Sequence, residues 1–396
     1  MSVPLDRLYN FIHDLCNHDI IIYRFYPHGS KNPTDCSPLV LVNLDFDAMY
    51  MVCYDQEPLT LELYNTRLPR TMHTLIRQQF FLYDKVLLLH SEQNSYPLTV
   101  FEQDDAIGVY WWSHAVIARD WFRYAEVDPV LSCTSIPKYD FLVYNRAWLG
   151  TREYRLKFAE LVAISGLYQN CYMNFSDTDA SQSCYDYSFS NPNFKIQHTD
   201  LAQYFRKNTA TANYSADYDS NDYAQCSIEV VLETLFDDAR WHLTEKSLRP
   251  IACGKPFILA ATPGSLKYLQ SYGFKTFDSW IDESYDSIQD PYERLVAITK
   301  TMQQFSDIPL EQKKQMLNEM QEVCNYNRDR FFSDEFMQLI LNELTTNLDA
   351  GVDKMQLYIG DRFKKIIRAL GSVAKCEPFI SRQALVETWA RLRKTR

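Results

Sequence analysis

The segment from Ser227 to Phe277 constrains the fold most, because buried strands alternate in it with helices. Runs of aliphatic and β-branched residues predict strands at 228–235 and 256–261, and amphipathic patterns predict helices at 244–253 and 266–272. A strand–helix–strand unit of this kind builds a parallel sheet, and such sheets bind ligands beyond the carboxyl ends of their strands. The sequence therefore predicts an α/β protein with a ligand site at that edge.

Polar residues gather where the first of these strands ends and the next helix begins. Glu233 closes the strand, and the helix starts with Thr244, Glu245, Lys246 and Arg249. Thr244 is predicted to be the N-cap, which leaves backbone N–H groups and the positive end of the helix dipole facing the crevice. Together with the two cations, this indicates a site for a phosphorylated, hydroxyl-rich ligand. The alternative is that Glu245 and Lys246 are ordinary solvated first-turn residues.

The same segment resembles the donor-binding half of GT-B glycosyltransferases, most closely the α-1,3-fucosyltransferase-like branch. The likeness rests on Glu233, the Thr-Glu-Lys triplet at 244–246, the Gly-Lys-Pro strand start at 254–256 and the Pro-Gly turn at 263–264. It implies two Rossmann-like domains and transfer of a sugar from a nucleotide-diphosphate sugar to an acceptor hydroxyl. It also implies an inverting displacement with no metal and no cofactor besides the nucleotide sugar. The Glu and Lys of the triplet would hold sugar or ribose hydroxyls and the diphosphate.

Residues 140–156 resemble the first strand–helix unit of the same donor domain. A strand is followed by Asn145 and by a helix that carries arginines. In the family an Arg early in this helix neutralises the leaving diphosphate, which places that role on Arg152, with Arg146 and Arg155 as alternatives. A diphosphate that leaves without a metal needs Arg, Lys and helix N-termini around it. The competing interpretation is a basic helix on the surface.

Residues 49–59 form an apolar strand that ends in two carboxylates, Asp55 and Glu57, before Pro58. The segment resembles the strand–acid–x–acid segment of the family's amino-terminal domain, whose first acid is the general base. The resemblance gives that role to Asp55, with Glu57 beside it. The acceptor hydroxyl requires such a group to take its proton as the new bond forms. The family has Glu here, so the shorter Asp would have to lie closer to the acceptor.

Two alternatives to this chemistry are present in the amino-terminal half. His114 is a second candidate base, with Asp120 as its orienting partner, unless it is a histidine packed beside Trp111. Asp45 and Asp47 form a D-x-D after a strand, a pattern that holds a divalent metal in GT-A transferases. This pair is distant in sequence from the phosphate-binding cluster, so no metal is expected.

Length and composition predict two domains and a tail. A chain of 396 residues that is 46% hydrophobic can bury two cores. We expect an acceptor-side domain at 1–132, a nucleotide-sugar domain at 137–350 and a basic amphipathic helical tail at 351–396. The stretch 170–225 is rich in Tyr, Ser, Asn and Asp, which predicts a polar insertion with only short elements. The chain has neither G-x-G-x-x-G nor G-x-x-x-x-G-K, which argues against a Rossmann dehydrogenase or a P-loop NTPase.

The cysteine pattern and the start of the chain indicate a cytoplasmic protein. Ten cysteines are scattered without a C-x-x-C pair, which argues for a reducing compartment and against a disulfide scaffold or a zinc site. The first residues contain acids and no apolar core of signal-peptide length. No run approaches the ~18 apolar residues of a membrane span.

The carboxyl-terminal residues 354–396 carry 11 Lys and Arg against 3 acids, whereas the whole chain has a net charge of −11. Apolar residues such as Ile359, Phe363 and Trp389 alternate with these cations at helical spacing. This pattern predicts docking to nucleic acid, to an anionic membrane or to the body of the protein. Two acceptors fit: a glycan at the inner membrane face, or a hydroxylated base in viral or phage DNA. The rival function is a non-catalytic binding protein that keeps the fold.

Overall fold

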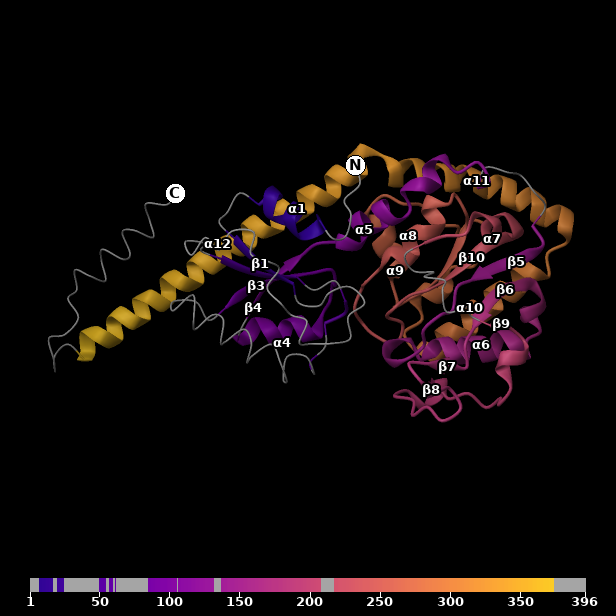
Figure 1. Cartoon of the computed structure of the whole chain (residues 1–396), viewed down its shortest axis with the longest axis horizontal. Coiled ribbons are helices and arrows are strands. Elements are labelled where there is room, and N and C mark those ends of the chain that lie inside the picture. The colour runs from indigo at the N-terminus through magenta and orange to yellow at the C-terminus, as the bar shows by residue number, and fades with distance from the viewer. Residues whose placement is uncertain are drawn as a thin grey trace.

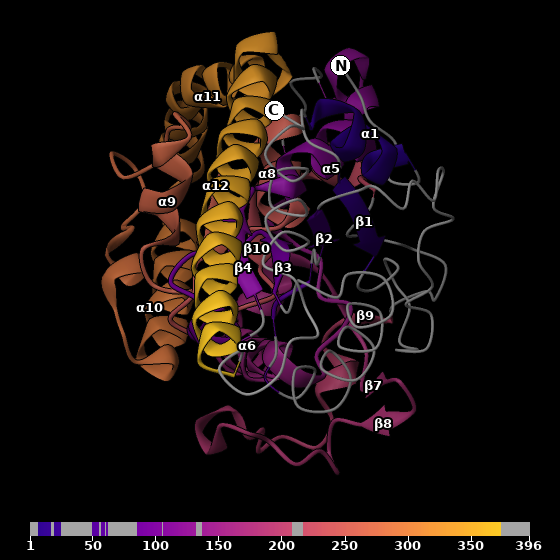
Figure 2. The same ribbon diagram turned by 90° about the vertical axis from the view of Figure 1, so that its left-hand side faces the viewer.

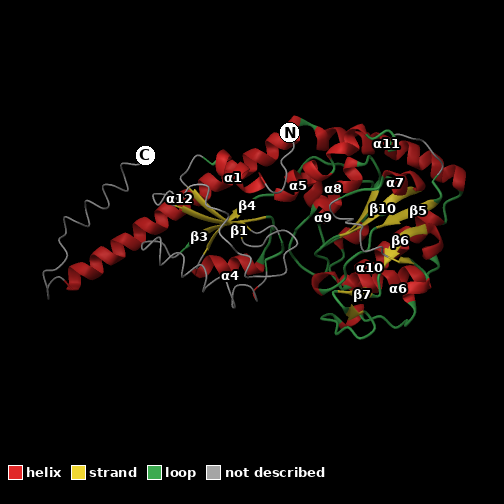
Figure 3. Cartoon of the chain, in the orientation of Figure 1, coloured by secondary structure: helices red, strands yellow, loops and turns green. Residues whose placement is uncertain are grey.

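The computed structural model describes residues 7–16, 20–24, 50–54, 57–59, 61, 85–104, 106–131, 137–207 and 217–373. Within these ranges the chain is a mixed α/β structure with two larger sheets, whose strands are all parallel. The two sheets lie in two separate parts of the molecule, and helices surround both (Figures 1 and 3). The predicted α/β class is confirmed.

The first sheet has the strand order β1-β2-β3-β4. Its strands are β1 (Ile20–Arg24), β2 (Tyr50–Tyr54), β3 (Val86–His90) and β4 (Ala106–Tyr110), and its helices are α1 (Leu8–Leu15), α4 (Tyr96–Asp104) and α5 (Ser113–Trp121). β4 ends at Tyr110. Trp111 and Trp112 leave the sheet because their indole N–H groups donate to the carbonyls of Ile340 and Leu243.

The second sheet has the order β11-β10-β5-β6-β9. Its strands are β5 (Tyr139–Val143), β6 (Cys171–Phe175), β9 (Arg206–Lys207), β10 (Cys226–Leu232) and β11 (Phe257–Ala260). The chain runs outward from β5 to β6 and β9, returns to β10 beside β5, and then continues to β11. Its direction across the sheet therefore reverses between β5 and β10. Crevices at such reversal points are the usual ligand sites of parallel sheets.

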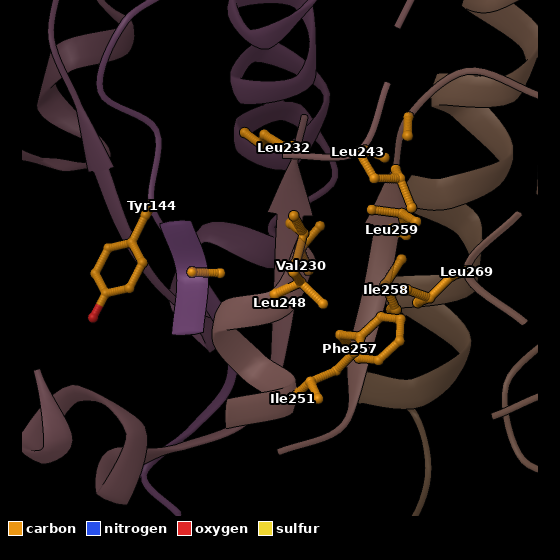
Figure 4. Close-up of a cluster of buried hydrophobic side chains, with 14 of the residues drawn as sticks. Tyr144, Val230, Leu232, Leu243, Leu248, Ile251, Phe257, Ile258, Leu259 and Leu269 are labelled. Atoms are coloured by element: carbon orange, nitrogen blue, oxygen red, sulfur yellow. The ribbon is translucent and has the colours of Figure 1, made fainter. Parts of the chain in front are cut away.

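Helices cover this sheet and join its strands. They are α6 (Tyr154–Ile164), α7 (Ser220–Gln225), α8 (Glu245–Ala252), α9 (Ser265–Ser271) and α10 (Pro291–Ser306). Figure 4 shows how α8 is held: Leu248 and Ile251 point from the helix toward Val230 of β10 and Phe257 of β11. The predicted strand–helix–strand–helix unit is confirmed, and the ends of its four elements differ from the predicted ends by one to three residues.

The prediction of a polar insertion at 170–225 with only short elements is wrong for its first part. Residues 171–175 form β6, which pairs along β5 as an inner strand of the sheet. The segment also contains a small hairpin, β7 (Thr178–Asp179) with β8 (Gln182–Ser183), and the 3-10 turns Pro192–Phe194 and Leu201–Gln203. The sequence of β6, Cys-Tyr-Met-Asn-Phe, contains no β-branched residue, so the strand signal is weak.

Two long helices, α11 (Leu310–Phe332) and α12 (Asp334–Val373), follow. α12 continues past residue 350, the expected end of the nucleotide-sugar domain, and packs along β3 and β4 of the first sheet (Figures 1 and 2). Gly351 allows this close approach, since a Cβ there would lie 2.7 Å from Cγ2 of Val109. The predicted tail boundary at 351 thus falls within a continuous helix whose Val352 and Met355 are buried.

A half-buried carboxyl in the loop before α10 makes the stability depend on pH. Glu283 accepts the backbone N–H of Phe277 at 2.7 Å, and burial raises the pKa of Glu283 to about 7 despite that bond. The contribution of Glu283 to the free energy of unfolding is fully present below its usual pKa of 4.5. This contribution is lost as the pH rises through about 7.

Glu283→Gln should therefore raise the free energy of unfolding at pH 8 by about 2–3 kcal/mol and leave it nearly unchanged at pH 4. The glutamine amide oxygen can still accept from the backbone N–H of Phe277, and the substitution removes the negative charge. Urea unfolding at the two pH values measures the effect, with the exposed Glu322→Gln as the matched control. Equal effects of Glu283→Gln at both pH values would contradict the raised pKa.

Candidate functional site

A cavity of about 420 Å³ opens beyond the carboxyl ends of β5 and β10, where the chain reverses its direction across the sheet. Most of the site residues predicted from the sequence meet there. The predicted residues that line the cavity are Glu57, His114, Arg146, Arg152, Arg155, Thr244, Glu245, Lys246 and Arg249. They come from both halves of the chain, because α5 packs against α8 and brings His114 to the start of that helix.

The N-terminus of α8 is built as predicted. Thr244 has extended backbone angles and is the N-cap, and its side chain accepts the backbone N–H of Lys246 at 3.4 Å. Glu233 supports this cap from below: its carboxylate accepts from the backbone N–H and the hydroxyl of Thr244, at 3.0 and 2.8 Å, and from the hydroxyl of Ser247. The arrangement fixes the positive end of the helix at the cavity.

Glu233 was predicted to bind the donor, and the structure corrects this role. The residue has no exposed surface and does not line the cavity. Its oxygens are used by Thr244, Ser247 and the backbone N–H of Thr234. Glu233 therefore positions the helix and makes no contact with the space a ligand would fill.

His114, Glu245 and Lys246 form a contiguous polar group on the cavity wall. Nδ1 of His114 lies 3.2 Å from one carboxylate oxygen of Glu245, and Nζ of Lys246 lies 2.8 Å from the other. Burial acts to raise the pKa of Glu245, but Lys246 and His114 outweigh it and hold that pKa well below its usual range. A buried carboxylate thus orients the imidazole. The expected partner Asp120 instead accepts from Arg123, at 3.3 Å.

A second histidine lies behind this group. The rings of His114 and His242 meet edge to face with centroids 5.1 Å apart. His242 is buried, and desolvation together with the neighbouring His114 lowers its pKa well below the usual value, so its ring is neutral. Its Nε2 has no hydrogen-bond partner within the described part of the chain.

Arg249 was predicted to contact a diphosphate, and in the structure its guanidinium is paired with a buried carboxylate. Its guanidinium donates through Nε to Glu229 at 3.2 Å and forms a second bond to the same oxygen through Nη2. Only 3% of the side chain is exposed, and it lies over the ring of Tyr144, 4.5 Å from the ring centre. Tyr223 also donates to Glu229, so Arg249 lines the cavity as part of a buried ion pair.

Arg155 and Asn145 also serve the framework. Arg155 is buried and donates to the backbone carbonyls of Ala147, Leu232 and Glu233, which ties the ends of β5 and β10 together. Asn145 lies below the cavity surface and donates to the carbonyl of Arg155 at 3.3 Å. The Oδ1 atom of Asn145 is buried and has no partner among the described residues.

The other charged side chains of the site lie at the opening of the cavity. Arg152 is 30% exposed and lies 3.8 Å from Glu57, which is 48% exposed and comes from the first half of the chain. Arg146 is exposed at the rim, and Lys246 is 17% exposed. These three cations, with the N-terminus of α8, are the groups of the site best placed to meet an anionic ligand.

The cavity also includes residues that the sequence did not single out, among them Tyr144, Leu149, Asp179 and Thr234. Tyr144 donates to Asp222 at 3.0 Å. Asp179 belongs to the β7–β8 hairpin in the segment treated as an insertion. The turn that follows it, Ala180-Ser181, has positive φ angles but lacks the Asn, Asp or Gly that usually mark such a turn in a sequence.

Several predictions lie outside the described residues. These are the candidate base Asp55, the D-x-D pair Asp45 and Asp47, and residues 374–396 of the tail. Where the chain is described, no cluster of three or more His, Cys, Asp or Glu could hold a metal ion. None of the helices there combines the length and apolarity needed to cross a bilayer.

Chemically, the cavity combines accessible cations, a helix N-terminus and a carboxylate-bound histidine. The first two favour a phosphate-bearing ligand, and the third is suited to accept a proton. Searches against protein-family models, curated proteins and solved structures give no match for this chain.

Proposed function

We propose that this chain is a glycosyltransferase that uses a nucleotide-diphosphate sugar, with two Rossmann-like domains in a GT-B-like arrangement. The observation that carries the proposal is the convergence of Glu57, His114, Arg152, Glu245 and Lys246 on one cavity. They come from four stretches that are distant in the sequence. The cavity lies at the reversal point of a parallel sheet, where nucleotides bind in such folds.

In this proposal the diphosphate lies between the N-terminus of α8 and the β5–α6 loop. Lys246 and Arg152 neutralise it, with Arg146 at the rim. The bond between the sugar and the diphosphate breaks as the acceptor oxygen attacks, so negative charge grows on the leaving phosphate. Positioned cations stabilise that charge most in a cavity that excludes water. The cations and helix dipole take the place of a metal.

The acceptor proton goes to a base on the opposite side of the sugar. We assign this role to His114, because the Glu245 carboxylate pairs with Nδ1 of the imidazole and so fixes the orientation of the ring. Glu57 lies at the same cavity, and Asp55 stays a candidate on the strength of the family resemblance. The acceptor is a glycan or a hydroxylated base in DNA, and residues 354–396 are proposed to dock on nucleic acid or an anionic membrane.

A second candidate function is non-catalytic binding of a nucleotide sugar. The buried contacts of Glu233 and Arg249 favour it, because two residues expected at the ligand are committed to the framework. The two functions differ in turnover. Release of nucleoside diphosphate from a bound nucleotide sugar supports the transferase, and stable binding without release supports the binding protein.

Lys246→Ala should weaken binding of the preferred nucleoside diphosphate by about 1.5–3 kcal/mol, which is about 10- to 150-fold. The ammonium group is partly exposed at the helix start and would lose a charge-assisted contact. Calorimetry with a panel of nucleoside diphosphates measures the loss, with the exposed Lys267→Ala of α9 as the matched control. Equal affinities of wild type and Lys246→Ala would show that the diphosphate does not bind at this end of α8.

A further inference from the structure

We propose that Asp179 binds the ribose hydroxyls of the donor nucleoside. The donor would then lie across the sheet edge with its nucleoside beyond β6 and its sugar beside His114. This inference rests on the proposed function and deepens it, since it assigns the direction in which the donor lies and the residue that recognises its ribose.

The first support is the way the Asp179 carboxylate is held. Its Oδ2 accepts the backbone N–H groups of Trp148 and Leu149, at 2.9 and 3.0 Å. Within the described part of the chain, Oδ1 accepts no hydrogen bond, and the residue lines the cavity. One oxygen therefore fixes the group to the β5–α6 loop, and the other is available to a ligand.

The second support is that the hairpin carrying Asp179 is anchored. Ala180 and Ser181 have φ angles of 46° and 70°, as in the tight two-residue turns that join antiparallel strands. The indole N–H of Trp148 donates to the carbonyl of Ser176 at 3.0 Å. The rings of Trp148 and Tyr187 also meet edge to face. The carboxylate is thus positioned before a ligand arrives, which lowers the entropy lost on binding.

The third support is chemical. A carboxylate repels phosphate and accepts hydrogen bonds, so its partner in a nucleotide sugar is a hydroxyl group or an N–H group of the base. The ribose and the transferred sugar both offer neighbouring hydroxyls. Glu245 cannot supply this contact as readily, because its two oxygens are bonded to His114 and Lys246.

The order of groups along the sheet edge favours the ribose. On the β10 side the cavity has His114, Glu245 and Lys246; after β5 it has Arg152; and after β6 it has Asp179. A nucleotide sugar has the same order, with sugar, diphosphate and nucleoside in line. The sugar must meet the base at His114, so the nucleoside extends toward Asp179.

The test is calorimetry on the full chain with UDP, GDP and their 2′-deoxy and 3′-deoxy forms. For the base that binds, wild type should prefer the ribose form over at least one deoxy form by about 10- to 100-fold. Asp179→Asn should lose this preference, while its amide oxygen still accepts from Trp148 and Leu149. The control Asp177→Asn removes an exposed charge two residues away and should keep the preference.

Three outcomes would overturn the inference in different ways. Equal binding of ribose and deoxy forms by wild type, with both weakened by Lys246→Ala, removes Asp179 from the ribose and leaves the proposed function intact. If Asp179→Asn weakens only intact nucleotide sugars and not the diphosphates, the residue faces the transferred sugar. If wild type binds no nucleoside diphosphate and no nucleotide sugar, the proposed function fails and the inference fails with it. The wild-type comparison needs no variant to fold.

Discussion

His114→Asn should lower the rate of glycosyl transfer by about 10²- to 10⁴-fold while leaving nucleoside diphosphate binding nearly unchanged. The asparagine amide can still donate to Glu245, but it cannot take a proton from the acceptor. The effect therefore belongs to the chemical step and not to donor binding. Release of nucleoside diphosphate from the nucleotide sugar, with water or an added acceptor, measures the rate without knowledge of the natural acceptor.

The chain offers a matched control for this experiment. His198 also pairs through Nδ1 with a buried glutamate, Glu160, at 3.1 Å, but it lies away from the cavity and is 46% exposed. His198→Asn should keep the wild-type rate. Should His114→Asn keep that rate while Asp55→Asn or Glu57→Gln loses it, the base would be one of the carboxylates of residues 49–59.

Arg249→Ala should lower the free energy of unfolding by about 3–5 kcal/mol, because it leaves the carboxylate of Glu229 buried without its partner. Glu229 is 1% exposed, and among the described residues its carboxylate would keep only the hydroxyl of Tyr223. Urea unfolding measures the loss. The exposed pair of Lys314 and Glu311 is the control, and Lys314→Ala should change stability by less than about 1 kcal/mol.

A double-mutant cycle separates the pair from other effects of truncation. Arg249→Leu with Glu229→Leu removes both charges, and the double variant should be more stable than the sum of the single losses indicates. If Arg249→Ala instead leaves stability unchanged and weakens diphosphate binding, Arg249 faces the ligand after all.

The two roles of Arg249 show where sequence reasoning stops. Its position in the first turns of α8 was predictable from the local pattern, as was the N-cap Thr244, since both depend on residues close in the chain. The direction of the Arg249 side chain depends on Glu229, twenty residues earlier. Glu233 is a similar case, because its carboxylate was expected at the ligand and serves the helix start instead.

Pairings between residues far apart in the chain could not be predicted from the sequence for the same reason. The contact between His114 and Glu245 spans 131 residues, so Asp120, on the same helix as His114, was the partner that local sequence suggested. Asp179 follows β6, whose composition hides the strand, and its bonds go to Trp148 and Leu149, some thirty residues earlier. The extension of α12 past 350 depends on Gly351 against Val109.

The most direct test of the central claim is a crystal structure of the protein with the nucleoside diphosphate that calorimetry selects. We expect density for the two phosphates at the N-terminus of α8, between Lys246 and Arg152, with the ribose toward Asp179. A diphosphate bound elsewhere on the chain, or an empty cavity at saturating ligand, would contradict it.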